Sequence, residues 1–192
     1  MCHPLLKDTR IWSFLLLADE DLAEAVRQGK CVFCGEALHR ADYPRKPRGG
    51  PDDLPPEYAL RISFCCCADD CRRRATPPSV RFLAQKVYLK VLVVLVTAMR
   101  QGPTPPGAKL LHQLFGVSRR TLARWQGWWQ DIFPRTRFWR GVRSRFLPPL
   151  TGGFPRALLE TTEAETSLDR FLALLRFLSP ITSRPGLEIH AS

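Results

Sequence analysis

Hydrophobic residues recur with helical and strand-like spacing in the first third of the chain. Residues 11–29 carry apolar side chains at steps of three and four, which predicts a helix that ends at Gly29. Large apolar residues alternate with small or polar residues over 58–64. This pattern predicts a half-buried strand with Tyr58, Leu60, Ile62 and Phe64 on its buried face. Residues 37–43 could form another strand, and the prolines and glycines of 44–56 predict a loop between the two.

Two further helices are expected later in the chain. Ser79 is suited to cap a long helix over 79–100, whose buried side would carry Phe82, Leu83, Val87 and Val91. The segment QGPTPP then breaks this helix. Near the end of the chain, Ser167 would cap an apolar helix over 168–178 that Pro180 stops.

Residues 109–129, KLLHQLFGVSRRTLARWQGWW, are typical of two short helices joined by a tight turn. Gly116 can take the positive φ that ends the first helix, Val117 would pack inward, and Ser118 would cap the second helix. The apolar face of that second helix would carry Leu122, Trp125 and Trp129. This pattern predicts a helix-turn-helix.

Arginines remain on the outer face of the second helix. Arg119 and Arg120 open it, and Arg124 follows one turn later. Because the second helix of a helix-turn-helix enters the major groove and its first turn meets base edges, Ser118 and these three arginines are candidate DNA-binding residues. The alternative is a solvated face on an ordinary pair of packed helices.

The seven cysteines favour metal binding over a disulfide framework, because their number is odd and they are clustered. Cys31 and Cys34 form a Cys-x2-Cys-Gly knuckle, in which backbone amides can point at two thiolates. A closed structural zinc site has four ligands, so two more are expected among the later cysteines, which are Cys65, Cys66, Cys67 and Cys71.

Among these later cysteines, Cys71 is the least ambiguous ligand. Cys66 is favoured as its partner because it continues the face of Phe64; Cys67 comes next, and Cys65 lies on the opposite face. His39 is a possible substitute ligand. Buried reduced thiols without a metal are the alternative interpretation of the whole group.

The charge of the chain suits a nucleic-acid partner. The 192 residues carry a net charge of +11, with 23 Arg against 6 Lys, and arginine pairs well with phosphates and guanine edges. Residues 72–148 hold 16 basic side chains and one acid, Asp131. Arg72, Arg73 and Arg74 are expected to contact phosphate. RNA or an anionic membrane surface would also attract such a stretch.

No stretch resembles a targeting segment or a membrane span. The longest apolar run, 91–99, is shorter than the roughly 20 residues needed to cross a bilayer. A cytoplasmic protein without membrane association is therefore expected.

Three stretches in order resemble a known group of proteins: CVFCGEALHRADYPRKPRGG, FCCCADDCRRRATPPSVRFLAQKVY and GVSRRTLARWQGWW. They are similar to the zinc-ribbon plus helix-turn-helix proteins associated with transposases and other bacterial mobile elements, over about residues 20 to 148. The resemblance implies DNA binding linked to transposition. It also implies zinc ligands and recognition-helix residues at matching positions, namely Cys31, Cys34, Cys66 and Cys71, and Arg119, Arg120 and Arg124.

The sequence thus predicts a mainly α chain with a small β zinc ribbon, of the α+β class. Its expected parts are an N-terminal helical segment (1–30), the zinc ribbon (31–75), a helix-turn-helix domain (79–148) and a C-terminal helical segment (149–192).

The expected function is non-catalytic binding of double-stranded DNA, with zinc as cofactor and a recombinase or transposase as a candidate partner. Catalysis by two metals needs converging carboxylates, whereas Glu160, Glu163, Glu165 and Asp169 crowd around one helix start. The alternatives are an adaptor for a recombinase or polymerase and a fragment of a transposase.

Overall fold

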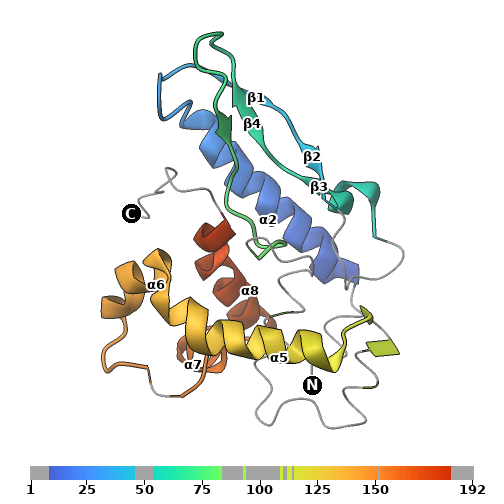
Figure 1. Cartoon of the computed structure of the whole chain (residues 1–192), viewed down its shortest axis with the longest axis vertical. Helices are drawn as coiled ribbons and strands as arrows, with labels where there is room; N and C mark the ends of the chain where they lie inside the picture. Colours follow the sequence, from blue (N-terminus) through green and yellow to red (C-terminus); the bar gives the residue numbers. More distant parts are fainter. Residues whose placement is uncertain are drawn as a thin grey trace. The chain divides into compact units, whose positions relative to one another are not determined.

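The computed structural model describes residues 9–45, 54–83, 93, 109, 112–113, 115–150 and 152–182 (Figure 1). These residues form a mixture of helices and short antiparallel strands. The chain divides into two compact units. The ribbon unit comprises His3–Leu89 and Leu178–Ser192, and the helical unit comprises Met1–Cys2 and Lys90–Phe177.

The ribbon unit begins with one long helix, α2 (Thr9–Gln28), which confirms the helix predicted over 11–29. Its buried positions follow a spacing of three and four along one side, at Ile11, Trp12, Leu15, Ala18, Asp19, Ala23 and Val26. The amide of Gly29 donates to the carbonyl of Ala25, which completes the last turn. The single polar residue in this buried set, Asp19, has a role described below.

Short strands lie beside α2 (Figure 1). β1 (Leu38–Arg40) pairs antiparallel with β4 (Phe64–Cys66), and β4 pairs with β5 (Arg74–Ala75). β2 (Tyr43–Pro44) pairs with β3 (Leu60–Arg61) in a separate two-stranded ladder. The core between helix and strands consists of Ala23, Val26, Cys31, Leu38, Ile62, Phe64 and Cys66.

The strand predicted over 58–64 is wrong in its start and in its exposed face. Pro56 lies in the first turn of the 3-10 helix η1 (Pro56–Ala59), so Tyr58 is helical and the first strand begins only at Leu60. Leu60 is 38% exposed, whereas Arg61 is 1% exposed and Ser63 is fully buried. Segment 76–83 supplies the cover: the Arg61 guanidinium lies 5.7 Å from the Phe82 ring centre and donates to the carbonyl of Pro77.

The expected helix start at Ser79 is also wrong, because Ser79–Leu83 are not helical. The Ser79 hydroxyl accepts from the amides of Arg81 and Phe82, as a cap would, but it also donates to Asp19 at 2.6 Å. Asp19 forms an ion pair with Arg81 at 2.7 Å, and both side chains are fully buried. This network fixes the segment against α2. The positions Val87 and Val91 lie outside the described residues.

The helical unit is described mainly from residue 115 onward. α5 (Arg119–Gly127) continues through a π-helical turn, η2 (Trp128–Ile132), and a 3-10 turn, η3 (Phe133–Arg135), into α6 (Arg137–Val142) and η4 (Arg143–Arg145). α7 (Arg156–Thr161) and α8 (Ser167–Phe177) follow. The amide of Asp169 donates to the Thr166 hydroxyl, so Thr166 caps α8, and the predicted cap at Ser167 is wrong by one residue.

Aromatic side chains build the core of the helical unit. The ring of Phe133 lies 4.9 Å from Trp129, 5.4 Å from Trp139 and 4.9 Å from Phe154, measured between ring centres. Trp129 and Phe133 are fully buried. Tilted and edge-to-face pairs of this kind add to the hydrophobic gain, so aromatic packing stabilises this unit.

Candidate metal centre and arginine surface

The first pair of cysteines sits on a tight turn directly after α2. Lys30 adopts a left-handed φ of 59°, which turns the chain out of the helix. The amide of Cys31 donates to the carbonyl of Glu36, and the amide of Gly35 donates to the carbonyl of Cys31. Gly35 has a φ of 78°, which a glycine takes without strain. The turn thus directs Cys31 and Cys34 toward the same point.

The second pair comes from β4 and the turn that follows it. Cys66 donates its amide to the carbonyl of Arg73, and the amides of Cys71 and Arg72 both donate to the carbonyl of Ala68. Arg72 has a φ of 45°, and the chain reverses here toward β5. This reversal returns Cys71 to the neighbourhood of Cys66.

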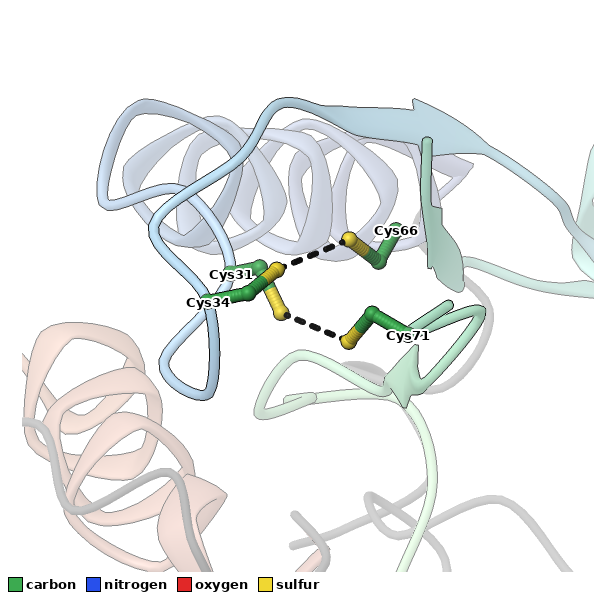
Figure 2. A group of neighbouring side chains, drawn as sticks. All are labelled: Cys31, Cys34, Cys66 and Cys71. Carbon is green, nitrogen blue, oxygen red and sulfur yellow. Dashed lines mark hydrogen bonds between the residues drawn. The ribbon is translucent and has the colours of Figure 1, made fainter. Parts of the chain in front are cut away.

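Figure 2 shows the four cysteine side chains pointing toward one another. Their Sγ atoms all lie within 4.8 Å of one another, with 3.8 Å between Cys31 and Cys71 and 3.3 Å between Cys34 and Cys66. Tetrahedral zinc with Zn–S bonds of about 2.3 Å requires S···S separations of about 3.8 Å. The donor set and its spacing therefore fit one tetrahedral metal ion.

These four are the cysteines favoured from the sequence, and the alternatives lie elsewhere. Cys65 directs its thiol at the carbonyl of Arg72, at 3.5 Å, on the other face of β4. His39 pairs with Cys65 in the sheet and is exposed. Neither His39 nor Cys67 belongs to the metal-ligating group.

The thiols of this group differ in acidity. A hydrogen bond from the backbone amide of Phe33, helped by that of Cys34, lowers the pKa of Cys31 to about 7. Burial raises the pKa of Cys66 to about 12, since the side chain is completely enclosed. A metal ion binds the thiolate forms, so metal binding to this group would release protons at neutral pH.

The turn predicted before α5 has the expected geometry. Residues 109, 112, 113 and 115 are helical. Gly116 ends this segment with a φ of 62°, and its amide donates a hydrogen bond to the carbonyl of His112. Val117 is fully buried, and the Ser118 hydroxyl accepts from the amide of Thr121 at 3.2 Å, which confirms the cap. His112 is exposed. Leu110, Leu111 and Leu114 lie outside the described residues.

The face of α5 opposite the arginines is buried as predicted. Leu122 is 6% exposed and Trp125 2%, and Trp129, in the π-helical turn η2 that continues α5, is fully buried. Arg119, Arg120 and Arg124 are exposed. The helix is therefore anchored to the aromatic core by one face and presents its arginines to solvent on the other.

Exposed arginines continue beyond α5. Eight arginines between residues 119 and 145 are exposed, and the described part of the chain contains no ion pair to any of them; they are Arg119, Arg120, Arg124, Arg135, Arg137, Arg140, Arg143 and Arg145. The same stretch has one acid, the exposed Asp131. We call these eight residues the arginine surface. Only the first three were predicted as site residues, although the arginine-rich composition of 131–146 already indicated the others.

The three arginines after the cysteines have separate environments. Arg72 forms an ion pair with the exposed Asp69, and Arg74 donates to the carbonyl of Ala41 at 3.1 Å. Arg73 lies over the ring of Phe33, with 4.2 Å from its guanidinium carbon to the ring centre. All three are exposed. The sequence pattern does not distinguish these three arginines or predict the contact with Phe33, although a large apolar residue inside a Cys-x2-Cys turn has little core within reach.

No protein-family model, curated protein or solved structure matches this chain. The geometry of the two sites therefore carries the functional argument. Among the described residues, no helix is both long enough and apolar enough to cross a bilayer.

Proposed function

We propose that this chain is a non-catalytic DNA-binding protein in which the arginine surface binds duplex DNA and one zinc ion holds the ribbon unit together. The observation that carries the proposal is the set of eight exposed arginines without an ion-pair partner in the described part of the chain. Arginine forks pair with phosphate oxygens and with guanine edges. Such a surface gains the most favourable electrostatic free energy when it binds a polyanion.

The electrostatics of α5 add weight to this proposal. Arg119 and Arg120 occupy the first turn, which contains no acid. The N-terminus of a helix carries a partial positive charge, so a cation there costs about 0.3–1 kcal/mol at an exposed site. A bound phosphate or an electron-rich base edge would offset that cost. Two adjacent arginines at this position therefore favour the binding of an anion, although they lower the stability of the free helix.

The arrangement also suits recognition of sequence. Ser118 fixes the start of α5, and Leu122, Trp125 and Trp129 hold the helix on its core. A rigid helix whose first turn is exposed resembles the recognition helix of helix-turn-helix proteins. We assign Arg119, Arg120 and Arg124 to base edges, and Arg135, Arg137, Arg140, Arg143 and Arg145 to phosphates.

The zinc proposed for Cys31, Cys34, Cys66 and Cys71 would be structural. Four thiolates fill all positions of a tetrahedral ion, which leaves none open for water or substrate. Two of these cysteines, Cys31 and Cys66, also belong to the apolar core of the ribbon unit. The link to transposition, with a recombinase or transposase as partner, follows from the resemblance to ribbon proteins of mobile elements.

Binding of duplexes selected from a random pool tests this function. Arg120→Ala should weaken binding to the selected duplex by about 1–3 kcal/mol and reduce its preference over a scrambled duplex. Arg156→Ala is the matched control, because it removes the same charge from an arginine already paired with Glu160. Affinity should also fall steeply with added salt. If added salt barely changes the affinity, the DNA-binding proposal is wrong and the adaptor function is favoured instead.

A further inference from the structure

The knuckle of the ribbon unit exposes two apolar side chains. Val32 is 56% exposed and Phe33 57%, and both lie between the ligand cysteines Cys31 and Cys34. The core of this unit is built without them. Transfer of such a side chain out of water is favourable, so Phe33 on the tip of this turn can gain free energy from a contact outside the chain.

Arg73 covers part of that ring. Its guanidinium carbon lies 4.2 Å from the ring centre, within the range of a cation–π contact. In the described part of the chain Arg73 has no acidic partner, whereas its neighbour Arg72 pairs with Asp69 and Arg74 is held by a backbone carbonyl. The guanidinium of Arg73 thus lies over one face of the Phe33 ring without an acid partner in this part of the chain, and Phe33 is still 57% exposed.

Two backbone hydrogen bonds close the turn that carries Phe33. Its ends are joined by the hydrogen bonds from Cys31 to Glu36 and from Gly35 to Cys31. A metal ion on the four cysteines would fix it further. Because the ring is already oriented, little conformational entropy is lost when a flat ligand stacks on it.

We propose that Phe33 and Arg73 form a stacking site for an unpaired nucleobase of single-stranded DNA or RNA. The base stacks on the face of the Phe33 ring that Arg73 does not cover, and the guanidinium of Arg73 contacts the adjoining phosphate. The chemistry of the pair favours this occupant over a neutral peptide, because the cation over the ring suits a phosphate and the aromatic ring suits a flat base. The site lies in the ribbon unit and works independently of the duplex binding proposed for the arginine surface.

The test uses the full-length, zinc-loaded chain and labelled oligonucleotides of about 12 residues. Probes are oligo-deoxythymidine, oligo-uridine, and the same deoxy strand with abasic sites. Base–aromatic stacking is worth about 1–3 kcal/mol per base, so Phe33→Ala should weaken binding to the base-containing strands by about tenfold. Val32→Ala is the matched control, since Val32 is equally exposed on the same turn, and it should change the affinity less than about twofold.

Further variants separate stacking from folding and from a plain apolar contact. Phe33→Trp should keep or strengthen binding, and Phe33→Leu should lose it while zinc content stays at the wild-type level. The abasic strand should bind to wild type and to Phe33→Ala with similar weakness. Tighter binding of oligo-uridine would identify RNA as the natural strand, and equal binding would assign recognition to the base alone; both support the site.

Two outcomes would overturn the site. The first is equal weakening by Val32→Ala and Phe33→Ala, which would indicate an apolar protein-binding tip. The second is unchanged affinity in Phe33→Ala. Arg120→Ala reports on the arginine surface through the preference for the selected duplex, whereas the difference between base-containing and abasic strands reports on Phe33, so the two proposals can fail separately.

Discussion

Reversing the charge of Arg120 should make the helical unit more stable while it weakens DNA binding. Arg120 lies in the first turn of α5, where the helix dipole disfavours a cation and favours an anion. Each effect is worth about 0.3–1 kcal/mol at an exposed position. Glu at position 120 would also pair with Arg124 one turn later. A Glu that precedes a basic residue by four positions stabilises a helix by about 0.2–0.5 kcal/mol. Arg120→Glu should therefore raise the free energy of unfolding by about 1 kcal/mol.

The stability change is measurable by denaturant unfolding followed through tryptophan fluorescence, because four of the five tryptophans belong to the helical unit. A change of about 1 kcal/mol corresponds to about 4–8 °C in Tm for a domain of this size. Duplex affinity, measured in the same buffer, should fall by more than the tenfold that one lost contact of about 1.4 kcal/mol implies. The Glu carboxylate would face phosphates instead of pairing with them.

Arg124→Glu provides the matched control for the dipole. Arg124 lies inside the helical segment that runs on from α5 into η2, away from the N-terminal end of the dipole, so its reversal should weaken DNA binding without the dipole gain expected at position 120. If Arg120→Glu binds duplex DNA as the wild type does, Arg120 does not contact DNA. If this variant loses stability together with binding, Arg120 is instead a structural residue.

Three further predictions concern the metal and the fold. Metal analysis should find about one zinc per chain, and Cys66→Ser should lose it while the neighbouring Cys65→Ser retains it. Asp19→Ala should cost about 3–5 kcal/mol in denaturant unfolding because it leaves a buried guanidinium without its partner, whereas the exposed Asp21→Ala should change little. Ser118→Ala should destabilise the helical unit by about 0.5–2 kcal/mol in thermal melts, through loss of the cap.

Local rules recovered the features whose partners are close in sequence. The cap at Ser118, the positive φ of Gly116 and the buried face of α5 all depend on residues within one or two helical turns. The cysteine grouping also followed from local spacing, because strand alternation places Cys66 on the face of Phe64. These features depend on short-range geometry, which the sequence carries directly.

The errors occurred where distant residues decide the conformation. Ser79 has a good capping residue type, but its hydroxyl bonds to Asp19, which is 60 positions away. Arg61 is buried in a position where alternation predicts exposure, since Phe82 and the carbonyl of Pro77 lie beside it. A sequence pattern reports one amphipathic face, and it cannot report a second layer that covers the polar face as well.

The metal centre and the proposed stacking site depend on the same turn, and this has a physical consequence. Cys31 packs in the core of the ribbon unit, while Phe33, two residues later, projects from it. Both residues belong to the turn that the hydrogen bond from the Gly35 amide to the Cys31 carbonyl closes. Zinc bound at the thiolates would therefore determine the orientation of the aromatic ring, and a chain without metal would lose the preorganised ring before it lost its arginines. Zinc should accordingly act on single-strand binding through the ribbon unit, while duplex binding by the separately cored helical unit persists.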